Sequence, residues 1–262
     1  MNADTPAPRT PDPAVPDPVL PDPAVPDPSM PDMPADAERT RGRYRYTRDG
    51  EPVGVDERFV LGEIAPGVVR VRSTRVTASP TARLEADVRF TTEAVSSLVR
   101  WVGSDPTVVR AATAEYVERG GLVEASWSVD GESGSDQVVG TAYPLMRVFT
   151  GPFVLRSVNG LDVVVPDIAD ARAASTFLRP SVSRRSAEVL GAREVLVDGV
   201  ARAGTAYRWT GGAYGDEGAD FVIDAGGLLL SYVVTQPSGR WEVTLADVIG
   251  PWPVPLSWPT PA

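Results

Sequence analysis

The sequence contains no cysteine, no histidine and no lysine, and all 25 of its basic residues are arginines. Without cysteine there can be no disulfide, and without cysteine or histidine the common ligand sets for zinc are missing. The same absences exclude Ser-His and Cys-His nucleophilic catalysis, a Schiff-base lysine and the lysine of a phosphate-binding Walker loop. Any acid or base must be Asp, Glu or Tyr. A bias toward GC-rich codons, which favours arginine, explains the missing lysine without a functional reason.

Long apolar runs are also missing from the chain. No window approaches the ~20 apolar residues that a membrane-spanning helix needs, so we expect no transmembrane segment. The chain begins Met-Asn-Ala-Asp-Thr-Pro and shows no basic stretch followed by an apolar one, so no signal peptide is predicted. We therefore expect a cytoplasmic protein, if the chain begins at its true start.

Proline and aspartate dominate the first 37 residues. Pro11 to Pro18 reads PDPAVPDP, and Pro21 to Pro28 repeats it without change. The segment holds seven aspartates against one arginine, so it carries six of the ten net negative charges. Such a segment has little to bury and repels itself, which predicts a disordered, polyproline-like tail over residues 1–37. It could be a docking ligand for a protein partner with an aromatic-lined groove, or a plain spacer.

The charge balance of the remaining residues argues against nucleic acid as a partner. Residues 38–262 keep a net charge of about −4, whereas nucleic-acid binding calls for a basic face. One local exception is the row of alternate arginines from Arg39 to Arg45, which would share one face of a strand while Tyr44 and Tyr46 take the other. An anion site is one interpretation; we favour a solvated strand edge, because charge rows commonly blunt such edges.

Most of the chain shows short strand-like runs joined by tight turns. Four such runs follow one another between residues 203 and 248, and the last alternates strictly, with Trp241, Val243 and Leu245 on one face. Gly120-Gly121 separates two earlier runs in the manner of a two-residue hairpin loop. This regular spacing predicts a mainly β protein with one large curved antiparallel sheet, half-barrel or barrel-like, over residues 38–250.

Helix is scarce, and we expect one or two short helices. Residues 167–179 are the best candidate, because Asp167 can cap the start, alanine is frequent and Pro180 ends the run. A second short helix is expected within residues 143–158, interrupted at Gly151-Pro152. The final segment, residues 251–262, is rich in proline and tryptophan and is expected to form a strap over an apolar patch or a frayed tail.

Two acidic, glycine-rich stretches could in principle hold a cation. They run from Asp130 to Asp136 and from Gly211 to Asp220. Carboxylate and carbonyl oxygens suit calcium, but neither stretch has EF-hand spacing. We therefore predict hairpin loops there, and no metal or cofactor.

The apolar interior is the remaining candidate for a site. A highly curved antiparallel sheet either fills its interior with side chains or leaves a cavity in which a ligand fits. Large aromatic residues are the best candidates to line a cavity, although each could instead be an ordinary core residue. The predicted ligand-binding residues are Trp101, Trp127, Tyr143, Phe149, Trp209, Tyr232 and Trp241.

Several stretches give the chain a resemblance to uncharacterised bacterial β-proteins. They are the opening Tyr44 to Gly54, the long series of strands, the insert from Tyr143 to Val158, Tyr207-Arg208-Trp209, and Asp220 to Gly227. Those proteins wrap one antiparallel sheet around a helix and are similar to the periplasmic lipoprotein-carrier half-barrel. The resemblance covers about residues 42–249 and implies that fold, but it brings no catalytic residues. The chain departs from the carriers in showing no signal peptide.

Three functions follow from these observations. The leading prediction is non-enzymatic binding of an apolar ligand, such as a lipid or acyl chain, in a cavity of the curved sheet. The alternative is a scaffold or protein-interaction module with an inert β domain, which a filled interior and a large exposed apolar patch would favour. An enzyme that uses Asp or Glu alone comes last, because no spacing in the sequence supports it. Two carboxylates buried together in a cleft would favour it.

Overall fold

The computed structural model describes residues 40–78, 81–104 and 107–250, which belong to one compact unit. The predicted tail (residues 1–37) and the predicted C-terminal strap (residues 251–262) lie outside the described residues, so both stay predictions. No helix in the described part of the chain is long and apolar enough to cross a membrane.

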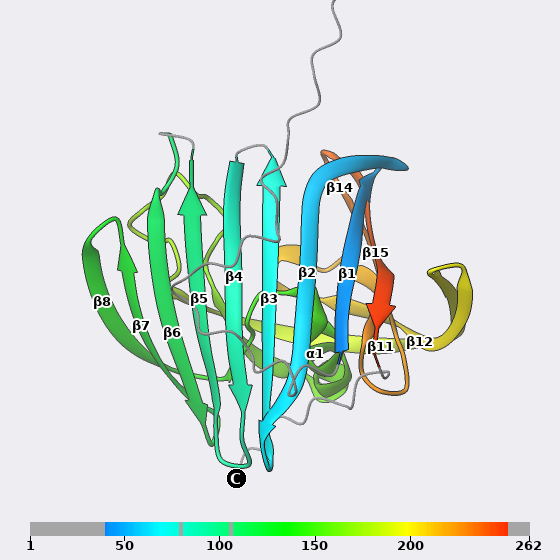
Figure 1. Cartoon of the computed structure of the whole chain (residues 1–262), viewed down its shortest axis with the longest axis horizontal. Coiled ribbons are helices and arrows are strands. Elements are labelled where there is room, and N and C mark those ends of the chain that lie inside the picture. Colours follow the sequence, from blue (N-terminus) through cyan, green and yellow to red (C-terminus); the bar gives the residue numbers. More distant parts are fainter. Residues whose placement is uncertain (1–39, 79–80, 105–106, 251–262) are drawn as a thin grey trace, which may run out of the picture. The chain divides into compact units, whose positions relative to one another are not determined.

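The first half of the described chain is an antiparallel series of eight strands (Figure 1). Each strand pairs with the next in sequence through short turns, and the predicted Gly120-Gly121 hairpin joins the sixth to the seventh with both glycines at positive φ. The strands are β1 (Thr40–Arg48), β2 (Glu51–Ala65), β3 (Val68–Ala78), β4 (Thr81–Phe90), β5 (Val95–Gly103), β6 (Ala111–Arg119), β7 (Leu122–Val129) and β8 (Glu132–Val139).

The second half continues the same sheet, because the last strand pairs antiparallel with β1. Its strands are β9 (Thr141–Ala142), β10 (Leu161–Pro166), β11 (Pro180–Val197), β12 (Val200–Thr210), β13 (Ala219–Ile223), β14 (Leu229–Gln236) and β15 (Gly239–Ile249). The lateral order is β8 to β1, then β15 to β9, and only β9 with β10 is parallel. The short β9 also lies beside β6 and β7, so the sheet is nearly closed. The predicted fold class is confirmed.

The pairing corrects the expectation for the arginine row. Arg41, Arg43 and Arg45 do share the outer face of β1, and Tyr44 and Tyr46 face the core, as alternation predicts. However, β1 lies between β2 and β15 and is no sheet edge. The sequence could not show this, because the partner strand is almost two hundred residues away.

The helical elements cluster between β9 and β10. α1 (Thr150–Arg156) follows η1 (Arg147–Phe149) and precedes η2 (Ser157–Asn159), while η3 (Gly212–Tyr214) lies between β12 and β13. The helix predicted within residues 143–158 is confirmed, but Gly151-Pro152 do not interrupt it. Both lie in the first turn of α1, where proline is tolerated because its N–H would have no helical partner.

The second predicted helix, over residues 167–179, is wrong. This segment consists of turns, and Leu178 takes a left-handed φ of +56°. The backbone of Asp167, at the start of the loop, forms two hydrogen bonds with the end of the loop. Its N–H donates to Arg179 O at 2.9 Å, and its carbonyl accepts from Leu178 N at 2.7 Å. Closing a loop between β10 and β11 has overridden the helix propensity of the alanines.

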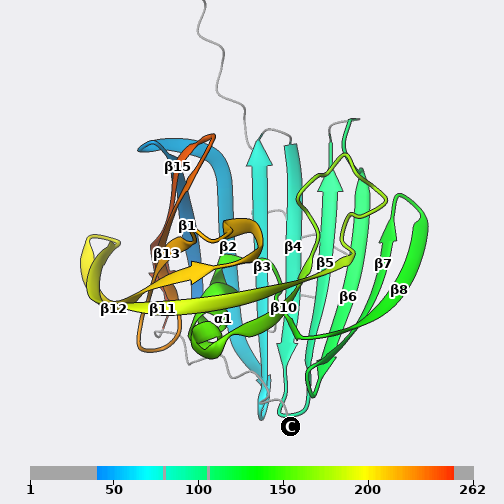
Figure 2. The same cartoon turned by 180° about the vertical axis from the view of Figure 1, so that it is seen from behind.

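The core lies on the concave side of the sheet. In Figure 2, β10 and β11 run across the strands β2–β6, and α1 lies next to β11. Alternate residues of the strands point inward and are buried, as in β6; in β4 the outward-facing Glu85 and Asp87 are buried as well. One lateral row of inward residues passes through consecutive strands and positions the candidate site. It contains Tyr44, Glu57, Arg75, Leu84 and Trp101.

Candidate functional site

The loop of residues 167–179 packs into the concave side of the sheet over β5–β7. Its buried Phe177 meets Trp101 edge-on, with ring centroids 5.1 Å apart. Tyr116 donates its hydroxyl to the carbonyl of Leu178. The other side of the loop is held by Val109, whose N–H donates to Ala171 O at 2.6 Å. These anchors fix both flanks of the loop, although it contains no regular secondary structure.

A pocket of about 350 Å³ lies between this loop and the sheet. One wall comes from β3, β4 and β5, and the opposite wall from the loop. Apolar groups make up most of its surface, with charged groups at two places. The lining residues are Arg75, Thr77, Ala82, Leu84, Trp101, Val108, Ile168, Ala169, Asp170, Ala171 and Arg172.

Arg75, which lines the pocket from β3, belongs to a buried ion pair. Arg75, with 13% of its side chain exposed, pairs with the fully buried Glu57 at 2.7 Å. A second Nη2 bond goes to Leu145 O at 3.2 Å. The two partners face each other on neighbouring strands β2 and β3, so the sheet register itself brings the charges together. Because both are withdrawn from water, each depends on the other for charge compensation.

Glu57 is the centre of a larger hydrogen-bond network. Tyr46 donates its hydroxyl to Glu57 Oε2 at 2.5 Å, and the backbone N–H of Arg147 donates to Oε1 at 2.5 Å. Burial raises the pKa of Tyr46 well above its usual value, although the nearby Arg75 charge opposes this shift. Tyr46 therefore remains a protonated donor at all physiological pH values. The carboxylate is satisfied on both oxygens and is not a free acid or base.

The seven predicted ligand-binding residues have different surroundings. Trp101 lines the pocket and donates its Nε1–H to Val109 O at 2.9 Å. Four others, Tyr143, Phe149, Trp209 and Tyr232, are buried in the hydrophobic core. Trp127 and Trp241 are only partly buried and pack against that core. Their assignment as ligand-binding residues stays a prediction.

Sequence reasoning missed the charged part of this site. Glu57 lies between Val55 and Phe59 in an alternating run, at the same parity as Phe59 and Leu61, which marks it as inward-facing. A carboxylate on the apolar face of a strand is the signal that could have identified it. The partnership with Arg75 was not readable, because it depends on the register between β2 and β3.

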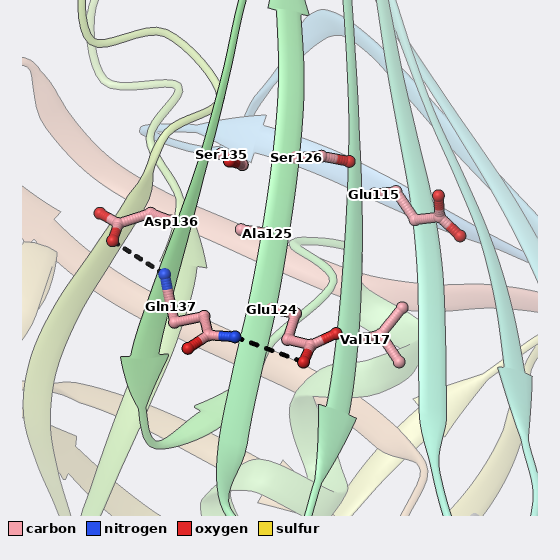
Figure 3. Close-up of a pocket in the computed structure, with 8 residues that line it drawn as sticks. All are labelled: Glu115, Val117, Glu124, Ala125, Ser126, Ser135, Asp136 and Gln137. Carbon is pink, nitrogen blue, oxygen red and sulfur yellow. Dashed lines mark hydrogen bonds between the residues drawn. The ribbon is translucent and has the colours of Figure 1, made fainter.

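A larger hollow lies on the outer face of β6, β7 and β8 (Figure 3), with a volume of about 660 Å³. About half of its wall is polar, and Gln137 Nε2 donates to Glu124 Oε1 at 3.4 Å. Glu115, Glu124 and Asp136 lie along its rim and are exposed. Because solvated carboxylates bind water well and apolar ligands poorly, this hollow is a weaker candidate than the pocket.

No group of three or more acidic side chains that could hold a metal ion occurs within the described ranges. The glycine-rich stretch from Gly211 to Asp220 forms η3 and the turn into β13. Asp220 instead pairs with Arg208 at 2.9 Å across the β12–β13 ladder.

Comparison with known proteins adds little beyond the fold. No family model matches the chain, and no curated protein matches it in sequence. One similar solved structure is a β-barrel-like protein with a domain of unknown function, DUF1849, from Brucella abortus. It is 9% identical, the match covers 82% of this chain and 98% of that one, and the TM-score is 0.48. The complex of MucB with MucA(peri) gives 10% identity, coverage of 81% and 93%, and a TM-score of 0.18.

At these TM-scores neither likeness supports an argument about function, and the predicted similarity to the lipoprotein-carrier half-barrel stays a prediction. The strand pairing alone establishes what the protein is at the level of fold: a single, nearly closed, almost entirely antiparallel sheet.

Proposed function

We propose that the protein binds an apolar ligand, such as a lipid or a single acyl chain, in the pocket beneath the loop of residues 167–179. The observation that carries this proposal is the pocket itself: about 350 Å³ of space with a largely apolar wall. Small-molecule sites have volumes of roughly 300–1,000 Å³, so this one suits a small ligand or one chain.

The composition of the wall supports an apolar ligand over a polar one. Leu84, Trp101 and Val108 face Ile168 and Ala171 across the pocket. Each ligand methylene that moves from water into such a wall gains about 0.8 kcal/mol. Asp170 and Arg172 on the loop are exposed and lie at the boundary of the apolar surface, where a polar end of the ligand can remain hydrated.

The loop supplies a way in and out of the pocket. Its pocket-facing stretch, residues 168–172, is held to the rest of the protein by the hydrogen bond from Val109 to Ala171. Its other flank is anchored by the buried Phe177 and Leu178. Opening therefore requires the loss of this hydrogen bond and of the packing of Ile168 and Ala171 against the core, while the buried flank stays in place.

Native mass spectrometry of the full chain, purified from a bacterial lysate, tests this proposal. We expect a stoichiometric apolar adduct, or its appearance after incubation with mixed lipids. The variant Ala171→Trp fills the pocket from the loop and should abolish the adduct. Ala174→Trp places the same indole on an exposed position of the same loop and should retain it.

A clean apo mass after lipid incubation contradicts the proposal and favours the alternative, a protein-interaction module. The feature that supports this alternative is the β11–β12 hairpin, which extends past the strands that flank it and exposes Val189, Leu196 and Val200. Equal amounts of adduct in Ala171→Trp and Ala174→Trp would also contradict the proposed pocket, because the ligand would then bind elsewhere.

A further inference from the structure

A second group of residues inside the sheet is charged as well as aromatic. We call Arg147, Arg185, Trp209, Phe221 and Tyr232 the guanidinium–aromatic cluster. None of them lines the pocket. Phe221 and Tyr232 are lateral partners on β13 and β14 and stack with centroids 5.0 Å apart, and Trp209 meets Phe221 edge-on at 5.4 Å.

A cation lies at each end of this aromatic row. The Arg147 guanidinium lies 4.5 Å from the ring centroid of Tyr232, and the Arg185 guanidinium lies 5.0 Å from that of Trp209. Aromatic faces attract cations, which explains why the guanidinium groups lie there. Ring faces do not neutralise the two charges.

Arg185 is the more deeply buried cation, with 6% exposure. Its Nη1 donates to the carbonyl of Gly211 at 2.5 Å, and its Nε donates to the hydroxyl of Ser183 at 3.1 Å. Burial lowers the pKa of Arg185, and the groups that oppose this shift are the phenols of Tyr214 and Tyr143. An arginine this deep in a protein is normally paired with a carboxylate, and this one has only neutral partners in the described chain.

Arg147 has the same deficit. Its side chain donates from Nε to the Tyr46 hydroxyl at 3.3 Å. The nearby carboxylate of Glu57 accepts a hydrogen bond from the backbone N–H of Arg147. The side chains that donate to Glu57 are those of Arg75 and Tyr46, not that of Arg147. Across the residues that the structure describes, neither Arg147 nor Arg185 donates a side-chain hydrogen bond to a carboxylate.

Trp209 adds an independent observation. Its ring is 0% exposed, and its Nε1–H has no hydrogen-bond partner among the described residues. Buried donors are nearly always satisfied, so an orphaned one requires an explanation. This donor belongs to the ring beneath the Arg185 guanidinium.

We propose that the guanidinium–aromatic cluster is a binding site for an oxyanion, a carboxylate or a phosphate group. Such a group accepts several hydrogen bonds at once and matches the planar fork of a guanidinium. Arg185 supplies the charge, and Trp209, whose ring lies beneath it, supplies a neutral donor. Arg147 adds a more distant positive charge at the other end of the aromatic row. The glycine-rich stretch before β13 closes over Arg185: a Cβ at Gly212 would lie 2.3 Å from Arg185 Cζ, so only glycine lets the backbone approach this closely.

Isothermal titration calorimetry on the full chain tests the site with five probes: inorganic phosphate, acetate, dodecyl phosphate, dodecanoate and neutral dodecanol. We expect one equivalent of an oxyanion probe to bind and its affinity to fall with added salt. Binding of inorganic phosphate or acetate identifies a site for free anions. Binding of only the dodecyl anions identifies a site for the headgroup of an amphiphile.

Three variants assign the binding to the cluster. Arg185→Gln should weaken binding of the oxyanion probe by roughly 10- to 100-fold, as expected for losing a charged hydrogen-bond donor. Arg147→Gln should weaken it less, because Arg147 lies at the other end of the aromatic row. The matched control is Arg184→Gln, because Arg184 is the next residue, 61% exposed and paired with Asp162 at the surface. It should leave the affinity within about twofold, as surface pairs contribute little.

Trp209→Phe keeps an aromatic ring in the core and removes the orphaned donor. The variant should therefore fold, and its affinity for the oxyanion probe should be lower. This variant keeps the test open if Arg185→Gln fails to fold. The absence of binding by all four oxyanions, or affinities unchanged in Arg185→Gln and Trp209→Phe, overturns the inference. Ala171→Trp should leave phosphate binding intact, so failure of the apolar pocket and failure of the oxyanion site are distinguishable.

Discussion

The apolar pocket and the guanidinium–aromatic cluster lie in one sheet but follow different physical rules. Leu84, Trp101 and Ile168 around the pocket are neutral, so an empty pocket loses only dispersion contacts. The cluster contains cations without carboxylate partners, so an empty cluster retains a desolvated charge at each end. A neutral pocket wall is therefore stable without a ligand, whereas a buried guanidinium is stabilised by a counter-charge. The comparison also explains why Glu57 is essential: it gives Arg75 the partner that Arg147 and Arg185 lack.

Among the variants that test this comparison, Glu57→Gln should change the free energy of unfolding most. The change keeps the shape of the side chain and removes the charge that compensates Arg75, so we expect a loss of about 3–5 kcal/mol in the free energy of unfolding. Urea denaturation followed by tryptophan fluorescence measures it. Glu63→Gln on the exposed end of the same strand is the control. A loss for Glu57→Gln no larger than for the control would show that the buried pair is not needed.

The next effect compares a closed region of the core with the pocket wall. Leu229→Ala opens a cavity where the side chain is fully enclosed, and we expect a loss of about 3–5 kcal/mol. Leu84→Ala should cost about 2 kcal/mol, because one side of Leu84 already faces the pocket. Both values come from urea denaturation. Equal losses would mean that the pocket is as tightly packed as the core.

A smaller effect separates the two buried tryptophans that differ in their hydrogen bonds. Trp101→Phe removes the donor to Val109 O and leaves that carbonyl unsatisfied, at a cost of about 1–3 kcal/mol beyond the lost packing. Trp209→Phe removes a donor that has no partner among the described residues, so it should cost less by about that amount. Thermal unfolding of both variants checks the order, and the reverse order would contradict the assignment of Trp209 as an orphaned donor.

The smallest effect is expected near neutral pH. Because histidine, cysteine and lysine are absent, few groups titrate between the carboxylates and the tyrosines, and stability should be nearly constant from about pH 6 to 9. Burial raises the pKa of Tyr143 from its usual 10.0 to about 12, partly opposed by Arg147. The unfolded chain therefore loses this proton first, and stability should fall as the pH rises from 10.0 through about 12.

Tyrosinate absorbance during an alkaline titration checks this prediction, with the urea-unfolded protein as reference. Burial also raises the pKa of Tyr44, Tyr46, Tyr116 and Tyr232, so most of the absorbance change should lag behind the reference. Coincident titration curves would show that the phenols are accessible in the folded state.

The sequence predicted the strands well because alternation is local. Trp241, Val243 and Leu245 repeat every second residue, and a reader needs no other part of the chain to assign them to one face. The same local logic failed for residues 167–179, where alanine content predicts helix but Phe177 and Leu178 are held in the core by distant Trp101 and Tyr116.

The site was harder to predict than the fold because it depends on register. Glu57 could be placed on the inner face, but its pairing with Arg75 requires the alignment of β2 with β3. The cluster requires still more, since Arg147 and Tyr232 meet only after residues 85 positions apart are brought together. Cation–π contacts leave no spacing in the sequence, so only Trp209 and Tyr232 were predicted, as separate aromatic residues, and Arg147 and Arg185 were missed.

The pairing of β1 with β15 has a consequence for how the chain is made. During synthesis β1 emerges first among the described strands and β15 last, so Tyr44 can pair with Leu245 only when the chain is almost complete. Until then the nascent first half keeps the edge of β1 without its final partner, and that edge carries Arg41, Arg43 and Arg45 on one face. Arginines next to an open edge oppose pairing with other nascent chains. We therefore expect the arginine row, which lies at no sheet edge in the folded protein, to oppose aggregation while β1 still lacks β15.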